Sequence, residues 1–233
     1  MGEKWQYFIE EGYLLPVLFA QVLIVSLILI LLPLLTLKRA VAANEVKNSF
    51  RSLSYFALLG IGYLFFEIAF IQKMILSLEN PAYAASTVIA SVLISSGIGS
   101  LMSQRSRTLR SPRVLLILAA LAVVYSIMLP GTIVSISRHP LLVKIILVFV
   151  ILMPAGILMG IPFPLGISVL GSTAPRLIPW AWAVNGCFSV LSPVLAVMLA
   201  LSTGYQTVLI TGAAMYLLAF WVMRRGWNVA SEK

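Results

Sequence analysis

The chain has 233 residues, of which 61% are hydrophobic and only 10% are charged. A soluble domain is about 45–50% apolar and about 25% charged, so this composition excludes an ordinary soluble protein and predicts an integral membrane protein. The net charge of +9 would suit a nucleic-acid-binding protein. We expect no nucleic-acid partner, however, because the basic residues stand mainly in the short gaps between apolar runs, as in membrane proteins.

The rare polar residue types exclude several kinds of site. The chain has no aspartate, one histidine (His139) and one cysteine (Cys187). Zinc, iron–sulfur and bis-histidine haem sites need several such ligands, so we expect no metal and no cofactor. A Ser-His-acid triad is disfavoured as well, because His139 falls in a short turn beside Pro140. We therefore expect no catalytic residue and no enzyme activity in this chain, although a soluble enzyme on another chain is compatible with it.

Seven apolar runs are long enough for transmembrane helices, each of which needs about 20 residues. The gaps between the runs are too short to hold a folded domain outside the membrane. The sequence thus predicts an all-α, polytopic membrane bundle, with a leading segment at 1–52 and a six-helix membrane domain at 53–233. The runs cover residues 13–37, 53–78, 83–102, 114–135, 141–166, 178–202 and 205–223.

The first run, 13–37, consists almost entirely of Leu, Val and Ile, which is typical of a lipid-facing helix or an anchor. A cleavable signal peptide would begin with positive charge, whereas Glu3, Glu10 and Glu11 precede this run, so we expect an uncleaved span. If every run crosses once, most Lys and Arg residues lie on one side of the membrane. An excess of Lys and Arg marks the cytoplasmic face, which predicts the N-terminus outside and the C-terminus inside.

The second run contains Glu67. A charged side chain costs roughly 2.5–3.5 kcal/mol at the centre of a transmembrane helix, and such groups usually face protein and have a function. Gly60, Tyr63 and Glu67 share a helix face, whereas Gln72 lies about 140° round the helix from Glu67. Lys73 cannot reach Glu67 within the helix, because i,i+6 residues do not meet. Glu67 therefore needs a partner from another helix, or it stays protonated.

The third run is rich in Ala, Ser and Gly from Ala84 to Ser100. Small residues are typical of helices that pack tightly on their neighbours, and a hydroxyl-lined path is the alternative. The sixth run begins with Trp180 and Trp182, which suit an aromatic belt at the membrane interface. Asn185 follows them, either as an ordinary hydrogen bond between helices or as the partner of Glu67.

The fifth run is interrupted by Gly160, Pro162 and Pro164. Each proline removes a backbone donor, and Gly156 with Gly160 forms a pair that lets another helix approach closely. Irregular backbone at membrane depth is covered by protein or lines a cavity, and transporters build substrate sites from such broken helices. The alternative is a helix that ends near Gly160 and turns along the membrane interface.

Three segments resemble a known family. The first is Gly60-Ile-Gly-Tyr-Leu-Phe-Phe-Glu-Ile-Ala-Phe-Ile-Gln-Lys73, together with Asn80-Pro-Ala-Tyr83 and Ser96-Gly-Ile-Gly-Ser-Leu101. The second is Gly160-Ile-Pro-Phe-Pro-Leu-Gly166, and the third is Pro179-Trp-Ala-Trp-Ala-Val-Asn-Gly186. Together they are similar to the C-terminal membrane region of bacterial fused major-facilitator/spermidine-synthase-like proteins. The resemblance implies a major-facilitator-like half of six helices in the bacterial inner membrane. The family's soluble aminopropyltransferase-like domain has no counterpart in this chain, so its chemistry does not carry over.

The resemblance marks Glu67, Gln72, Asn185 and the break at Gly160–Pro164 as family-like positions without assigning their roles. The leading hypothesis is a non-catalytic multi-pass subunit that anchors or organises a larger membrane complex, with other subunits or a second copy as partners. The alternative is a transport component for a small cationic or polar, polyamine-like solute. Glu67 would then be the counter-charge, beside Tyr63, Asn185 and the broken fifth helix. Six helices are half the usual set, so alternating access would need a dimer or a second subunit.

Overall fold

A computed structural model describes residues 43–105 and 111–230, together with residues 17, 20, 21, 23–25 and 28. Within this part of the chain the regular structure is entirely helical, and six helices are long and apolar enough to cross a membrane. The predicted all-α multi-pass bundle is confirmed. The predicted span at 13–37 lies, apart from those scattered positions, outside the described residues.

The helices follow the predicted runs closely, with two differences. The predicted boundary between residues 52 and 53 falls inside a continuous helix, and the fifth run forms two helices instead of one. In chain order the elements are α2 (Ala43–Leu78), α3 (Pro81–Arg105), α4 (Arg113–Ile136), α5 (Leu141–Met159), α6 (Pro162–Thr173), the short 3-10 helix η1 (Pro175–Leu177), α7 (Ile178–Thr203) and α8 (Tyr205–Ala230).

A two-residue turn reverses the chain between α2 and α3. Glu79 ends α2 in the left-handed backbone region, with φ of 59°. The Asn80 side-chain oxygen then accepts hydrogen bonds from the backbone N–H groups of Ala82 (2.8 Å) and Tyr83 (3.3 Å). This is the N-cap arrangement that satisfies the free N–H groups of a first helical turn. It explains why α3 begins at once and lies against α2.

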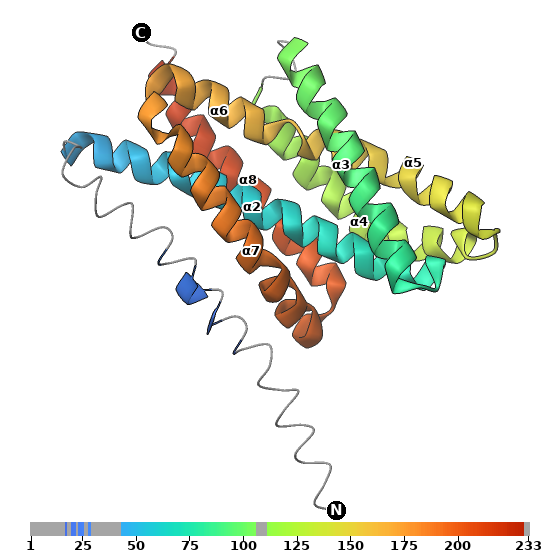
Figure 1. Ribbon diagram of the computed structural model, residues 1–233. Coiled ribbons are helices and arrows are strands. Elements are labelled where there is room, and N and C mark those ends of the chain that lie inside the picture. Colours follow the sequence, from blue (N-terminus) through green and yellow to red (C-terminus); the bar gives the residue numbers. More distant parts are fainter. Residues whose placement is uncertain are drawn as a thin grey trace, which may run out of the picture.

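Helix α2 runs through the centre of the bundle, where α3, α7 and α8 pack on it (Figure 1). Helix α8 also packs on α4, and α3 packs on α5, whereas α3 and α7 are not a closely packed pair. Aromatic rings fill the core: the centroid of the Phe66 ring lies 5.3 Å from that of Tyr216, and Phe70 lies 5.5 Å from Tyr125. On the strip of α2 between α3 and α7, Tyr63 and Glu67 are only half-buried.

The small residues of α3 make an unusually close contact with α5. A Cβ atom added to Gly99 would lie 1.9 Å from the Ile157 carbonyl oxygen, and one added to Gly160 would lie 2.0 Å from the Ser96 carbonyl oxygen. At Gly156 the added atom would lie 2.6 Å from the Ser95 Cβ. Only glycine permits such an approach of two backbones. The packing interpretation of the third run accounts for this face of α3.

The interruption of the fifth run lies between Met159, the last residue of α5, and Pro162, the first of α6. The Ile161 N–H bonds the Leu158 carbonyl (3.3 Å) in a tighter turn than that of an α-helix. The buried Tyr55 hydroxyl of α2 donates to the Pro162 carbonyl (2.8 Å). The irregular backbone is thus covered by α2 and α3, as non-helical backbone at membrane depth requires.

We expect Tyr55→Phe to destabilise the fold, because it removes the hydroxyl that donates to the Pro162 carbonyl. The expected loss is about 0.6–1.7 kcal/mol, which is the contribution of a hydrogen bond between membrane helices. The measurement is the free energy of unfolding of the purified protein in detergent. Tyr83→Phe is the matched control, because Tyr83 is 48% exposed. Equal losses in the two variants would contradict the assigned role of Tyr55.

The α2–α3 turn is also tied to α5 by an ion pair. Nζ of Lys144, whose side chain is 10% exposed, lies 2.8 Å from Oε1 of Glu79, which is 71% exposed. The hydrogen bond and the charge of Lys144 lower the pKa of the Glu79 carboxyl below its ordinary value. A lowered carboxyl pKa stabilises the folded state above the unfolded value of about 4.3, and this contribution is lost as the pH falls through the folded value.

We therefore expect wild type to unfold at a higher temperature than Glu79→Gln at pH 7, with the difference shrinking as the pH falls below about 4.3. The paired measurement is the unfolding temperature of both proteins in detergent across this pH range. A difference that persists in acid would show that the ion pair is not its cause.

Candidate functional site

The site is built around Glu67 of α2. Because α2 is continuous, Tyr63 lies one turn and Gly60 two turns from Glu67 on one face of the helix. The membrane-length part of α2 ends at Leu78, which places Glu67 about 16 Å inside it at 1.5 Å per residue. Glu67 is half-buried, and in the described part of the chain its carboxylate makes no hydrogen bond or ion pair.

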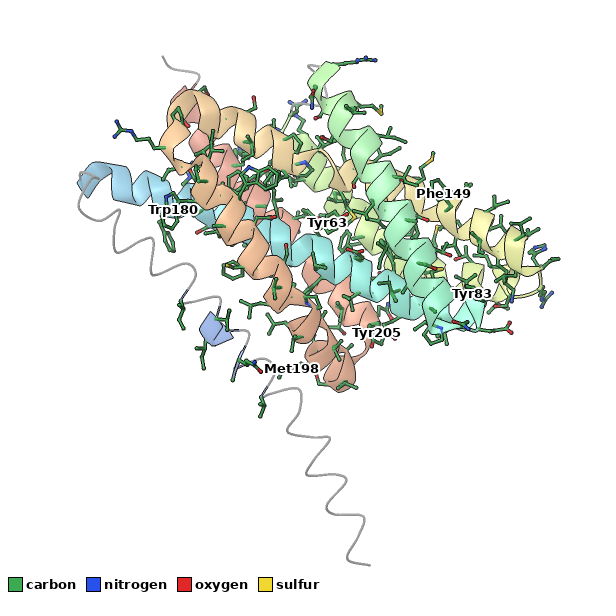
Figure 2. All side chains as sticks on the ribbon, viewed as in Figure 1. Tyr63, Tyr83, Phe149, Trp180, Met198 and Tyr205 are labelled. Carbon is green, nitrogen blue, oxygen red and sulfur yellow. The ribbon has the colours of Figure 1, made fainter. Side chains whose placement is uncertain are left out.

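Tyr63 joins the Glu67 face to α3 and to the helix break. Its hydroxyl interacts with that of Ser96 in α3, and it is close enough to Glu67 for an electrostatic interaction. The Ser96 carbonyl in turn lies against Gly160, at the break between α5 and α6. Of the site residues predicted from the sequence, Tyr63 is therefore close to Glu67 and is connected to Gly160 through Ser96. Figure 2 shows Tyr63 on α2 between the ribbons of α3 and α7.

Asn185 connects α7 to α2 instead of pairing with Glu67. Its Nδ2 donates to the Phe56 carbonyl (3.0 Å). The backbone carbonyl of Asn185 lies so near Gly60 that a Cβ atom added there would be 2.7 Å from the carbonyl oxygen. Phe56 is eleven residues from Glu67, which corresponds to about 16 Å along the helix. In this structure Asn185 makes an ordinary hydrogen bond between helices, which is one of its two predicted roles.

The other residues that the sequence predicted for the site lie on other faces of α2 or in α6. Gln72 and Lys73 are half-buried on other faces of α2. Pro162 is buried at the start of α6, where its carbonyl accepts the hydrogen bond from Tyr55, and Pro164 is half-buried in the first turn of α6.

Two serines that the sequence did not predict as site residues complete the site, and one of them, Ser96, begins a motif of the family resemblance. Ser96 faces Tyr63, and Oγ of Ser189 in α7 would lie 3.1 Å from a Cβ at Gly60. We refer to the strip of α2 between α3 and α7, with its flanking residues, as the α3/α7 seam. It comprises Gly60, Tyr63 and Glu67 of α2, Ser96 of α3, and Asn185 and Ser189 of α7.

The chemistry available in the α3/α7 seam is limited. It offers one carboxylate together with neutral hydroxyl and amide groups, a set suited to a cation or a hydrogen-bond donor. Across the described ranges, no group of three His, Cys, Asp or Glu residues lies close enough to hold a metal ion.

The six membrane-length helices of the described residues are those of a multi-pass helical membrane protein. Comparison with family models, with curated proteins and with solved structures finds no match. The resemblance to spermidine-synthase-like membrane proteins therefore stays a prediction.

Proposed function

We propose that this protein is a non-catalytic, multi-pass subunit that anchors or organises a larger membrane complex and is related to spermidine-synthase-like membrane proteins. The observation that supports this most is the state of Glu67, an acid deep in a membrane-length helix, half-exposed and without a partner in the described chain. Such a carboxylate is costly in contact with lipid and is normally covered by protein. In a complex, helices of other subunits cover the part of the Glu67 side chain that this bundle leaves exposed.

The arrangement of the helices supports the same proposal. Helices α3 and α7 both pack on α2 but not closely on each other, and the Glu67 side chain between them is only half-buried. Polar side chains and small residues are the features by which membrane helices associate, and the α3/α7 seam has both. Its Ser96 and Ser189 are small and half-buried, and its Glu67 supplies a polar anchor, whereas Gly60 is already in close contact with the Asn185 backbone of α7.

The test is affinity purification in mild detergent. We expect the wild-type protein to carry a companion chain in constant stoichiometry, and Glu67→Leu to lose it. Gln72→Leu is the matched control, since Gln72 is also polar and half-buried but lies on another face of α2. A wild-type protein that is a monodisperse monomer with no companion would overturn the proposal.

A second candidate is a transport component for a small cationic or polar solute, and one observation favours it. The break between α5 and α6 lies against Ser96, which interacts with Tyr63 one turn from Glu67, so the irregular backbone is connected to the acid through these two residues. Transporters place substrate sites at such breaks. In this case Glu67→Gln abolishes cation uptake into vesicles while the protein still inserts, and normal uptake in that variant rejects the candidate.

A further inference from the structure

We infer that the α3/α7 seam is covered by a transmembrane helix of a different protein, and that this helix has a lysine or arginine at the depth of Glu67. The inference rests on the proposed function as a complex subunit and specifies the partner. It combines the charge of the seam, the position of the chain's own cations and the symmetry available to a second copy.

The negative charge of Glu67 favours a cationic side chain on the helix that packs against the seam. Glu67 is the one carboxyl group of the seam, and Tyr63, one turn away, has a neutral hydroxyl group, which hydrogen-bonds but does not neutralise the charge. An opposite charge nearby favours a carboxylate, and a matched ion pair removes much of the cost of placing it in the membrane. Lysine and arginine also have long apolar stems, which pack along a helix groove while the charged end reaches its partner.

Three basic residues of the helices that surround Glu67 do not pair with it. Lys144 pairs with Glu79 at the α2–α3 turn, and Arg51 donates to the Val222 carbonyl of α8 (3.0 Å). Lys73 lies six residues beyond Glu67 on a different face of α2. The described bundle therefore brings none of these three side chains to Glu67.

A second copy of this chain fits the seam poorly. Two copies inserted with the same orientation pair about a two-fold axis along the membrane normal, which sets each residue opposite its own counterpart at equal depth. Glu67 would then face Glu67, and Lys73 would be displaced by about 9 Å along the helix. Like charges directly opposed disfavour that dimer, so charge complementarity indicates a helix from another protein.

The experiment uses the full-length protein in its native membrane with a photo-crosslinking residue at Leu93, which is 56% exposed on α3 one turn from Ser96. Leu218 on α8, 48% exposed, is the matched control position. We expect Leu93 to capture one companion whose crosslinked transmembrane segment contains Lys or Arg. Glu67→Gln should lower the yield at Leu93 by about tenfold or more, since tenfold corresponds to only about 1.4 kcal/mol of pairing energy. The yield at Leu218 should not change.

A charge exchange gives the decisive step. Glu67→Lys should abolish the crosslink at Leu93, and replacement of the companion's basic residue by glutamate should restore it. Capture of a protein does not by itself support the inference. A captured helix without a basic residue, a crosslink to a second copy, or a yield indifferent to Glu67→Gln would overturn it. In the first and third cases a co-purifying companion still leaves the proposed function standing, whereas no companion at all removes both.

Discussion

Gly99→Ala is expected to cost about 1–3 kcal/mol of folding free energy or more, as overpacked interiors do. The added Cβ would lie 1.9 Å from the Ile157 carbonyl oxygen, far inside van der Waals contact. The atom in its way belongs to backbone, so no side-chain rotation relieves the clash and α3 has to move away from α5. The measurement is reversible unfolding of the purified protein in detergent.

Gly97→Ala is the matched control for this experiment. Gly97 lies two residues away on the same helix, and an added Cβ there meets nothing within 4 Å. Alanine is a better helix former than glycine by up to about 1 kcal/mol, so this variant should be as stable as wild type or slightly more stable. Similar losses in both variants would mean that the α3/α5 contact is looser than the structure shows.

Glu67→Leu is expected to stabilise the chain when it is purified alone. The wild-type carboxyl group is half-exposed in a membrane-length helix and has no hydrogen bond or ion pair within the described part of the chain. Removing it recovers part of the roughly 2.5–3.5 kcal/mol that a charge costs at the centre of a transmembrane helix. Gln72→Leu, on another face of the same helix, shows how much any polar-to-leucine change contributes. A clear loss of stability in Glu67→Leu alone would indicate a partner inside this chain.

Much of the fold follows from the sequence because hydrophobic length and helix breakers act locally. Six predicted runs correspond to membrane-length helices, and the glycine and prolines at 160–164 mark the break between α5 and α6. The continuation of α6 to Thr173 was not predicted, since the run was expected to end at residue 166. Pro162 and Pro164 stand in the first turn of α6, where a missing N–H costs little, so the prolines begin a new helix instead of ending the run.

The site was partly predictable for the same reason. Helical periodicity alone puts Tyr63 and Glu67 on one face and Gln72 on another. The contacts of Ser96 and Asn185 depend on how α3 and α7 cross α2, which no local pattern encodes. Tyr55 was missed because its hydrogen-bond partner is a backbone carbonyl 107 residues away. Interactions with distant backbone atoms leave no trace in residue spacing.

The pairing of Glu67 with a helix of another protein can be measured as the effect of Glu67→Leu on the free energy of unfolding, once in the isolated protein and once in the complex with its companion. We expect opposite signs, with the variant more stable than wild type when each is alone and less stable than wild type in the complex. A loss of stability in both states, or a gain in both, would overturn the proposed pairing.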